Sequence, residues 1–130
     1  MPGKFVTFEG GEGCGKTTQL RRLLKLALEV GIDAVATREP GGTALGGQLR
    51  EVLLEAKHDR PIVDRAELLL FAADRAQHID EFILPHLERG ALVLCDRYVD
   101  STIAYQGYGR GLDRDTIDRL NYIATGGLES

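Results

Sequence analysis

The segment Gly10–Thr17, with the sequence GGEGCGKT, restricts the fold of this chain more than any other part of it. It satisfies the pattern G-x-x-x-x-G-K-[ST], which forms a loop that follows a strand and opens a helix. The flanking residues predict that setting, because Lys4–Glu9 is rich in the phenylalanine and valine of short buried strands. After the loop, apolar residues recur at helical spacing from Leu20 to Leu28. We therefore expect a strand, a phosphate-binding loop and a helix.

The chemistry expected of this loop follows from its composition. Its glycines allow successive backbone N–H groups to turn toward phosphate oxygens, and the next helix points its positive end at the same anion. Lys16 is expected to reach the outer phosphates of a nucleoside triphosphate, and the Thr17 hydroxyl to bind Mg²⁺. The predicted nucleotide-binding residues are Gly10, Gly11, Glu12, Gly13, Cys14, Gly15, Lys16, Thr17 and Thr18.

Two other classes of protein with glycine-rich loops do not fit the sequence. A GTPase needs D-x-x-G after a strand and an Asn-Lys-x-Asp motif, but the chain has no D-x-x-G, and its only asparagine, Asn121, precedes Tyr122. A dinucleotide-binding loop has the spacing G-x-G-x-x-G and gives a Lys-Thr pair no role. A phosphotransferase is therefore the leading class.

Strands and helices are predicted to alternate along the rest of the chain. Ala34–Thr37 and Ala91–Cys95 have the composition of strands. A helix marked by Leu45–Leu53 is predicted to end before Pro61, and others to open at Asp64 and to span Asp80–Arg89. A last helix is predicted between an Asp113 cap and Gly126–Gly127. This order is typical of an α/β fold of the P-loop NTPase type, in which helices flank a parallel sheet and ligands bind at the carboxyl ends of the strands. Gly10–Thr17, Arg38–Thr43 and Asp96–Tyr98 follow predicted strands and are expected to converge there.

The third predicted helix has two different faces. Asp64, with Glu67 three residues later, resembles a capping box at its start. At about 100° per residue, Phe71, Arg75 and His78 share one face, opposite the expected core stripe. That stripe consists of Ala66, Leu69, Leu70, Ala73 and Ala76. The first helix is expected to bury Leu20, Leu23, Leu24, Ala27 and Leu28, and the last helix Ile117, Leu120, Ile123 and Ala124.

Composition narrows the choice of class further. The 130 residues, 43% of them hydrophobic, suit one domain that spans residues 1–130. The net charge of -4 argues against a nucleic-acid partner, and no apolar run approaches the ~20 residues that span a membrane, so we expect a cytoplasmic protein. Cys14 and Cys95 lack metal-ligand spacing and are expected to be reduced. His58, His78 and His86 are expected at the surface.

Four segments, taken together, resemble the thymidylate kinase family. They are Gly10–Thr18, Thr37–Thr43 (TREPGGT), Phe71–Arg75 (FAADR) and Asp96–Tyr98 (DRY). The Arg-Glu-Pro-Gly-Gly-Thr run is the most family-specific of them, whereas Asp-Arg-Tyr alone is a weak signal. The resemblance spans nearly all 130 residues. It implies transfer of the γ-phosphoryl group of ATP to dTMP, with Mg²⁺ as the metal.

The resemblance also implies how the phosphates are held. The acceptor is a phosphate oxygen already ionised at about pH 7, so cations that align two polyanions matter more than a general base. The residues implied in catalysis are Lys16, Arg38, Asp96 and Arg97. The arginine fork suits the dTMP phosphate, and Asp96 would join Thr17 in the magnesium shell. Glu12 would bind the deoxyribose 3′-OH, and the alternative is a solvated loop glutamate.

The base of dTMP is implied to lie against the helix face described above. Phe71 would stack on thymine and Arg75 would donate to a base carbonyl, with packing of Phe71 against a neighbouring helix as the alternative. Asp100–Gly107 matches the second nucleoside-binding stretch of the family, with Tyr105 against the sugar. The remaining implied substrate contacts are Glu39, Pro40, Arg50, Ser101, Thr102 and Gln106.

Family members are longer than these 130 residues, which implies a fold that is incomplete at the C-terminus. The missing part would hold the last strands, the adenine contacts and a lid whose arginines compensate for a glycine loop that has none. Two alternatives stay open: another deoxynucleotide or nucleoside kinase, and a non-catalytic nucleotide-binding module. The resemblance also implies a homodimer.

Overall fold

The computed structural model describes residues 3–10, 15–55, 57–98 and 114–128. Its elements, in chain order, are β1 (Lys4–Gly10), α1 (Lys16–Glu29), β2 (Ala34–Glu39), α2 (Ala44–Arg50), the π-helical η1 (Glu51–Glu55), α3 (Asp64–His78), the π-helical η2 (Ile79–Ile83), α4 (Leu84–Glu88), β3 (Leu92–Tyr98) and α6 (Arg114–Thr125). Because α3, η2 and α4 follow one another without a break, residues 64–88 form one long helical rod. The predicted strands and helices are confirmed, and β2 and β3 extend further toward their carboxyl ends than predicted.

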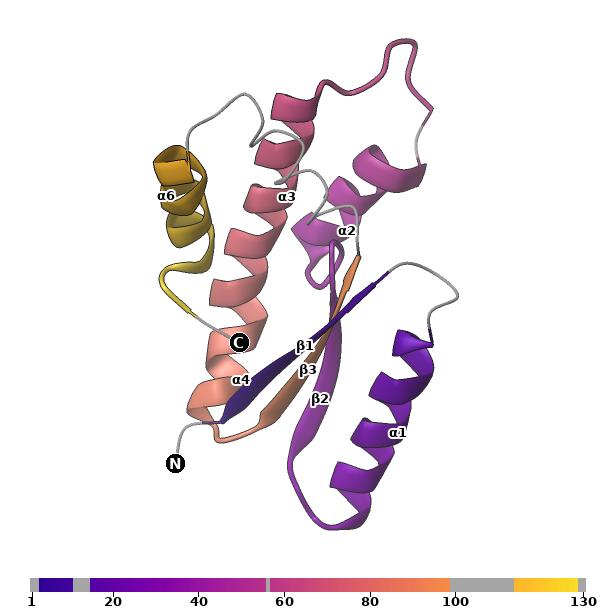
Figure 1. Cartoon of the computed structure of the whole chain (residues 1–130). Coiled ribbons are helices and arrows are strands. Elements are labelled where there is room, and N and C mark those ends of the chain that lie inside the picture. The colour runs from indigo at the N-terminus through magenta and orange to yellow at the C-terminus, as the bar shows by residue number, and fades with distance from the viewer. Residues whose placement is uncertain (1–2, 11–14, 56, 99–113, 129–130) are drawn as a thin grey trace.

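A three-stranded parallel sheet lies at the centre, in the order β1-β3-β2 (Figure 1). The middle strand, β3, carries Val93, Leu94 and Cys95, all 0% exposed, as expected of a strand covered on both faces. The register aligns Gly10 with Tyr98. The predicted parallel sheet is therefore confirmed, and so is the meeting of the three strand ends at one edge.

Helices cover both faces of this sheet (Figure 1). α1 packs against all three strands, and the rod 64–88 lies on the opposite side. The β1–β2 connection crosses the sheet in one direction, and the β2–β3 connection crosses back in the other. Because crossovers between parallel strands are right-handed, the helices of the two connections lie on opposite faces. The core between the sheet and the rod consists of Phe5, Val93 and Cys95 with Ile79, Ile83 and Leu87. None of the described helices combines the length and the apolar character that a membrane crossing requires.

The predicted core stripe of α3 is wrong. Leu69 is 54% exposed and Ala73 is exposed, while Ala66, Leu70 and Ala76 are only half-buried. The buried residues are Leu68, Phe71, Ala72, Asp74, Arg75 and His78. The helix therefore turns its more polar face inward, because that face meets β2 and α2, where hydrogen-bonding partners satisfy its charged groups.

Other helical predictions are confirmed in part. In α1, Leu20 and Ala27 are buried and Leu24 is half-buried, but Leu23 and Leu28 are 37% and 54% exposed. In α6, Ala124 is buried and Ile123 is 74% exposed, whereas the side chain of Ile117 lies outside what the structure describes. α3 begins at Asp64 itself, and its N-cap, Val63, makes no side-chain cap bond. The predicted capping role of Asp64 is therefore wrong; that of Asp113 lies outside the described residues.

Candidate active site

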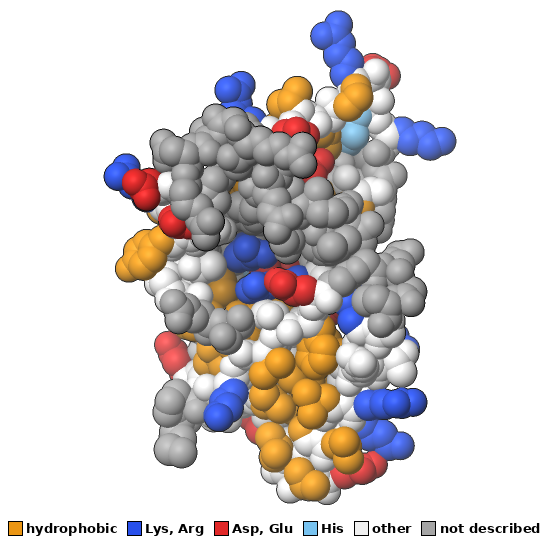
Figure 2. Space-filling view, viewed as in Figure 1, with side chains coloured by type: hydrophobic (Ala, Val, Ile, Leu, Met, Phe, Trp, Pro, Cys, Tyr) orange, Lys and Arg blue, Asp and Glu red, His pale blue; other side chains and the backbone are white. Residues whose placement is uncertain are grey.

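The sheet register brings residues of the predicted site together. Asp96 on β3 stands between Phe8 of β1 and Arg38 of β2, and the next residue, Arg97, stands between Glu9 and Glu39. Acidic and basic side chains consequently gather where the strands end, and Figure 2 shows blue and red side chains side by side in the middle of one face. Gly11, Glu12, Gly13, Cys14, Ser101, Thr102, Tyr105 and Gln106 lie outside the described residues.

The start of α1 provides the described part of the predicted triphosphate site. Gly15 is its N-cap with φ 81°, a left-handed conformation that glycine adopts without strain, and the first turn carries no acidic side chain. The Lys16 ammonium forms an ion pair with the Asp96 carboxylate and donates to the Arg97 carbonyl at 3.2 Å. The Thr17 hydroxyl lies 3.5 Å from Asp96 Oδ2. Thr18, on the same turn, is exposed.

These groups fit the cofactor that the sequence predicts. The N-cap of α1 is a glycine, so among the described residues no N-cap side chain competes with an anion for the N–H groups of the first turn. A hydroxyl and a carboxylate, here from Thr17 and Asp96, are oxygen ligands of the kind that Mg²⁺ prefers. Lys16 occupies the position from which an ammonium can balance phosphate charge.

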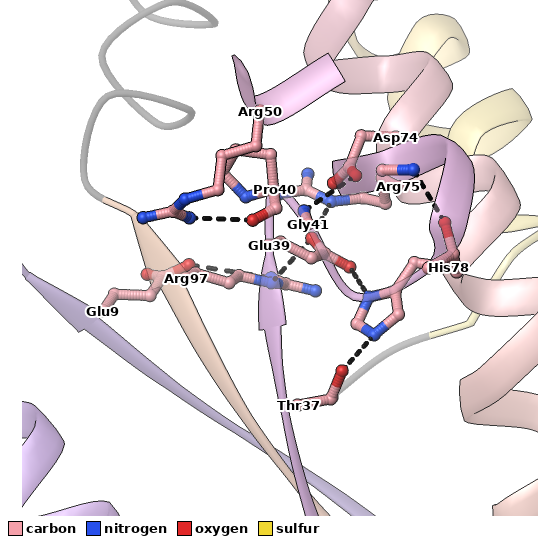
Figure 3. A network of polar contacts seen from close by, with 12 residues as sticks. Glu9, Thr37, Glu39, Pro40, Gly41, Arg50, Asp74, Arg75, His78 and Arg97 are labelled. Atoms are coloured by element: carbon pink, nitrogen blue, oxygen red, sulfur yellow. Dashed lines mark hydrogen bonds and ion pairs between the residues drawn. The ribbon is translucent and has the colours of Figure 1, made fainter. Parts of the chain in front are cut away.

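A buried carboxylate, Glu39, organises the other half of the site (Figure 3). Its side chain is 2% exposed, and Arg75 Nε donates to Oε1 at 2.9 Å. His78 Nδ1 lies 2.7 Å from Oε2, and Arg97 Nε lies 3.5 Å from Oε1. Burial raises the pKa of Glu39, but the hydrogen bond with His78 and the charges of Arg75 and Arg97 outweigh burial and hold the pKa at about 2.

The prediction that His78 lies at the surface is wrong. Its side chain is 0% exposed, and besides Glu39 it contacts the Thr37 hydroxyl through Nε2 at 2.6 Å. No partner for this ring could be predicted from the sequence, because both partners come from β2 and precede His78 by 39 and 41 residues. The prediction of a surface position holds for His58, which is exposed, and holds in part for His86, which is half-buried.

Sequence reasoning also missed Asp74, the residue before Arg75. Its side chain is buried at 1% exposure, and its Oδ1 accepts a hydrogen bond from the Gly41 N–H at 3.1 Å. Burial raises the pKa of Asp74 to about 6, against the effect of the Gly41 bond. The sequence feature that could have indicated a role for Asp74 is its place within the FAADR segment, on the helix face of Phe71 and Arg75.

The arginines and the aromatic ring of the predicted acceptor site differ in their surroundings. Arg97 has Nη1 3.6 Å from Glu9 Oε1, and its guanidinium lies 5.6 Å from the centre of the Phe5 ring. Arg38 is exposed, and Arg50 donates to the Pro40 carbonyl at 2.8 Å. Phe71 is 3% exposed. This burial agrees with the alternative that Phe71 packs within the fold, and stacking on thymine stays a prediction.

The glycines of the Pro40–Gly47 region allow α2 to approach α3 closely. A Cβ added to Gly42 would lie 2.5 Å from two ring atoms of His78, and one added to Gly46 would overlap Asp74 Oδ1. The Thr43 hydroxyl caps α2 by accepting from the Gly46 N–H at 2.9 Å. By contrast, a Cβ on Gly47 would meet nothing within 4 Å.

This difference gives a matched pair of substitutions within one helix. Gly46→Ala is expected to lower the free energy of unfolding by about 1 to 3 kcal/mol, because Asp74 is buried and has little room to move. Gly47→Ala is expected to raise it by up to about 1 kcal/mol, because alanine is the better helix former. Urea denaturation of both variants measures the two changes. Equal effects of the two substitutions would contradict the close packing of α2 on Asp74.

One cluster in this network has the composition of a metal site. Ligand atoms of Glu39, His78 and Cys95 all lie within 4.8 Å of one another, the one such group among the described residues. Burial raises the pKa of the Cys95 thiol far above its ordinary value, so the thiolate that a metal requires is disfavoured. The nearby positive charges of Arg75 and Arg97 also oppose a bound cation. We therefore interpret the cluster as a hydrogen-bonded core.

Comparison with known proteins places this geometry in a family. A family model described as thymidylate kinase matches residues 8–129. The whole chain is 56% identical to a thymidylate kinase of Nostoc punctiforme and 58% identical to one of Nostoc sp., and it spans 62% of the length of each. It also superposes on the crystal structure of thymidylate kinase from Ehrlichia chaffeensis with a TM-score of 0.79 and 42% identity, covering all of this chain and 72% of that one. These matches and the parallel sheet with its converging strand ends show that the chain belongs to the thymidylate kinase family.

Proposed function

We propose that the intact protein transfers the γ-phosphoryl group of ATP to dTMP, which yields dTDP and ADP. The observation that carries this proposal is the meeting of Lys16, Asp96 and Arg97 at the strand ends, next to the Glu39–Arg75 pair. A phosphotransferase that joins two polyanions needs such a group of cations around one acidic metal ligand. The family matches support the choice of thymidylate as acceptor.

On the donor side, the start of α1 and the end of β3 would hold ATP. Lys16 would leave Asp96 and bind the outer phosphates, while the N–H groups at the start of α1 face the same anion. Thr17 and Asp96 would bind Mg²⁺. When bound, Mg²⁺ would neutralise charge that develops during transfer.

On the acceptor side, Arg97 and Arg38 would hold the dTMP phosphate, and Arg75 would face the base. Arg97 is suited to this role because ion pairs with Glu39 at 3.5 Å and Glu9 at 3.6 Å already restrict its side chain, which leaves less conformational entropy to lose on binding. The exposed Arg38 belongs to the adjacent strand, where its register partner is Asp96, the residue before Arg97. The acceptor oxygen is already ionised, so the alignment of the two nucleotides, rather than proton abstraction, would limit the reaction.

Three further features stay predictions, the first two from length and composition and the third from the family resemblance. They are a single domain over residues 1–130, a cytoplasmic location and a homodimer. Sedimentation velocity of the purified protein measures the oligomeric state directly.

Arg75→Ala tests the acceptor assignment. Without the guanidinium, the selectivity of the intact gene product for dTMP over dCMP, measured as the ratio of kcat/KM, is expected to fall about 10-fold or more. The affinity for ATP is expected to change less than about 2-fold, because Arg75 pairs with Glu39, whereas Lys16 at the start of α1 pairs with Asp96.

The exposed Arg65 of the same helix provides the control, and Arg65→Ala is expected to keep the wild-type selectivity. If Arg75→Ala leaves the ratio unchanged, the base does not lie at this helix face. If the wild type prefers another nucleoside monophosphate, the protein is a different nucleotide kinase.

A further inference from the structure

The buried ring of His78 lies behind the arginines of the proposed acceptor site. It reaches from α3 to β2, where it contacts Thr37 and Glu39, as Figure 3 shows. The backbone of Gly42 lies against the ring, and the Phe82 ring stacks on it at 5.7 Å between centroids. At 0% exposure, the imidazole is held from several sides in one orientation.

The hydrogen bonds of this ring can be assigned from the state of Glu39. The pKa of Glu39 is held at about 2, so the carboxylate is ionised near neutral pH and can only accept hydrogen bonds. His78 Nδ1 must therefore carry a hydrogen and donate it to Oε2. In a neutral ring, Nε2 then accepts from the Thr37 hydroxyl.

This bond determines how Glu39 meets the arginines. Because His78 holds Oε2, the carboxylate offers Oε1 to both Arg75 and Arg97. Both arginines approach Oε1 through Nε, Arg75 at 2.9 Å and Arg97 at 3.5 Å. One carboxylate thus meets two guanidinium groups on different elements, in a hydrogen bond with Arg75 of α3 and in a longer ion pair with Arg97 of β3, whose Nε has no hydrogen-bond partner among the described residues.

We propose that His78 is a positioning residue for the acceptor nucleotide, acting through Glu39 on Arg75 and Arg97. The proposal rests on the function proposed above. If the ring no longer held Oε2, Glu39 would be able to turn and pair through both oxygens with one arginine, which would displace the other. Misplacement of a substrate-positioning group by about 1 Å is sufficient for losses of up to about 100-fold.

A pair of substitutions distinguishes the role of Nδ1 from that of Nε2. In His78→Asn, the shorter amide nitrogen lies near the position of Nδ1 and keeps a donor for Glu39. In His78→Gln, the longer amide reaches toward the position of Nε2 and Thr37, and the bond to Glu39 is lost. The exposed His58, changed to glutamine, is the control.

The first readout needs no ligand. The Nε–H resonances of Arg75 and Arg97 in ¹⁵N NMR spectra of the intact gene product are expected to persist in His78→Asn and in His58→Gln. In His78→Gln they are expected to shift or broaden, because Glu39 Oε1 is no longer fixed. Unchanged arginine signals in a folded His78→Gln variant would overturn the proposal.

The second readout is binding, measured by titration calorimetry. The Kd for dTMP is expected to rise about 10-fold or more in His78→Gln and less than about 3-fold in His78→Asn, with the Kd for ATP unchanged in both. A parallel loss of both ligands, or equal losses in the two variants, would show a merely structural role and overturn the proposal.

Two further outcomes are informative. A wild type that does not bind dTMP contradicts the proposed function, and the arginine signals then still decide whether His78 positions them. If His78→Gln does not fold, ¹⁵N NMR of the His78 ring in the wild type replaces it, because the proposal requires a hydrogen on Nδ1. A ring that carries its hydrogen on Nε2 alone would then overturn the proposal.

Discussion

Replacing Lys16 with methionine is expected to lower kcat for ADP formation about 1000-fold or more in the intact gene product. The reason is electrostatic, because Lys16 is the ammonium at the start of α1 and already pairs with the Asp96 carboxylate. In phosphoryl transfer, the protein contributes mainly the position of charges, so loss of one fixed cation removes stabilisation that water does not replace. Methionine keeps much of the length and apolar character of the lysine stem. Steady-state kinetics with saturating ATP, Mg²⁺ and dTMP measure the change.

A lysine elsewhere on the same helix provides the matched control. Lys25 is 79% exposed and lies 4.0 Å from Glu29, so Lys25→Met is expected to leave kcat within about 2-fold of the wild type. The affinity of Lys16→Met for dTMP is expected to stay near the wild-type value, since the acceptor side is formed by other residues. A fall in kcat of less than about 10-fold in Lys16→Met would contradict the role given to the ammonium.

Replacing Glu39 with glutamine is expected to lower the free energy of unfolding by about 3 to 5 kcal/mol. Glu39 is the buried carboxylate shared by Arg75, His78 and Arg97, and glutamine leaves the buried positive charges without their partner. Urea denaturation at pH 7 measures this loss. The exposed Glu29, 57% exposed, provides the control, and Glu29→Gln is expected to change stability by less than about 0.5 kcal/mol.

The same substitution is expected to change the response to acid. The pKa of Glu39 is lowered from 4.5 to about 2, so its contribution is present above about pH 4.5 and is lost as the pH falls toward 2. Wild type should therefore lose more stability than Glu39→Gln over this range. The contribution of Asp74 to stability has the opposite pH dependence. Because its pKa is raised from 3.8 to about 6, this contribution grows as the pH falls from about 6 to 3.8. Identical acid profiles of wild type and Glu39→Gln below pH 4.5 would contradict the network.

The donor half of the site could be predicted because its signals are local in sequence. The pattern of Gly10–Thr17 and the apolar strand before it specify a strand, a loop and a helix within 20 residues or so. The parallel sheet then places Asp96 and Arg97 at the same edge without any knowledge of side chains. The structure adds the contact of Lys16 and Thr17 with Asp96.

The buried network could not be predicted because its signals are not local. A periodicity argument counts charged residues as exposed, so it assigned the inward face of α3 to Leu69 rather than to Asp74 and His78. These residues are buried because partners on β2 and in the Pro40–Gly47 region satisfy them. For the same reason, the close approach of Gly42 and Gly46 to α3 becomes visible only in three dimensions.

The most direct test of the proposed activity is the acceptor preference of the intact gene product. ADP release would be measured with ATP, Mg²⁺ and, in turn, dTMP, dUMP, dCMP and dGMP. We expect kcat/KM for dTMP to exceed that for dCMP and dGMP by at least about 10-fold. A lack of preference for dTMP, or a higher kcat/KM for another acceptor, would contradict the assignment.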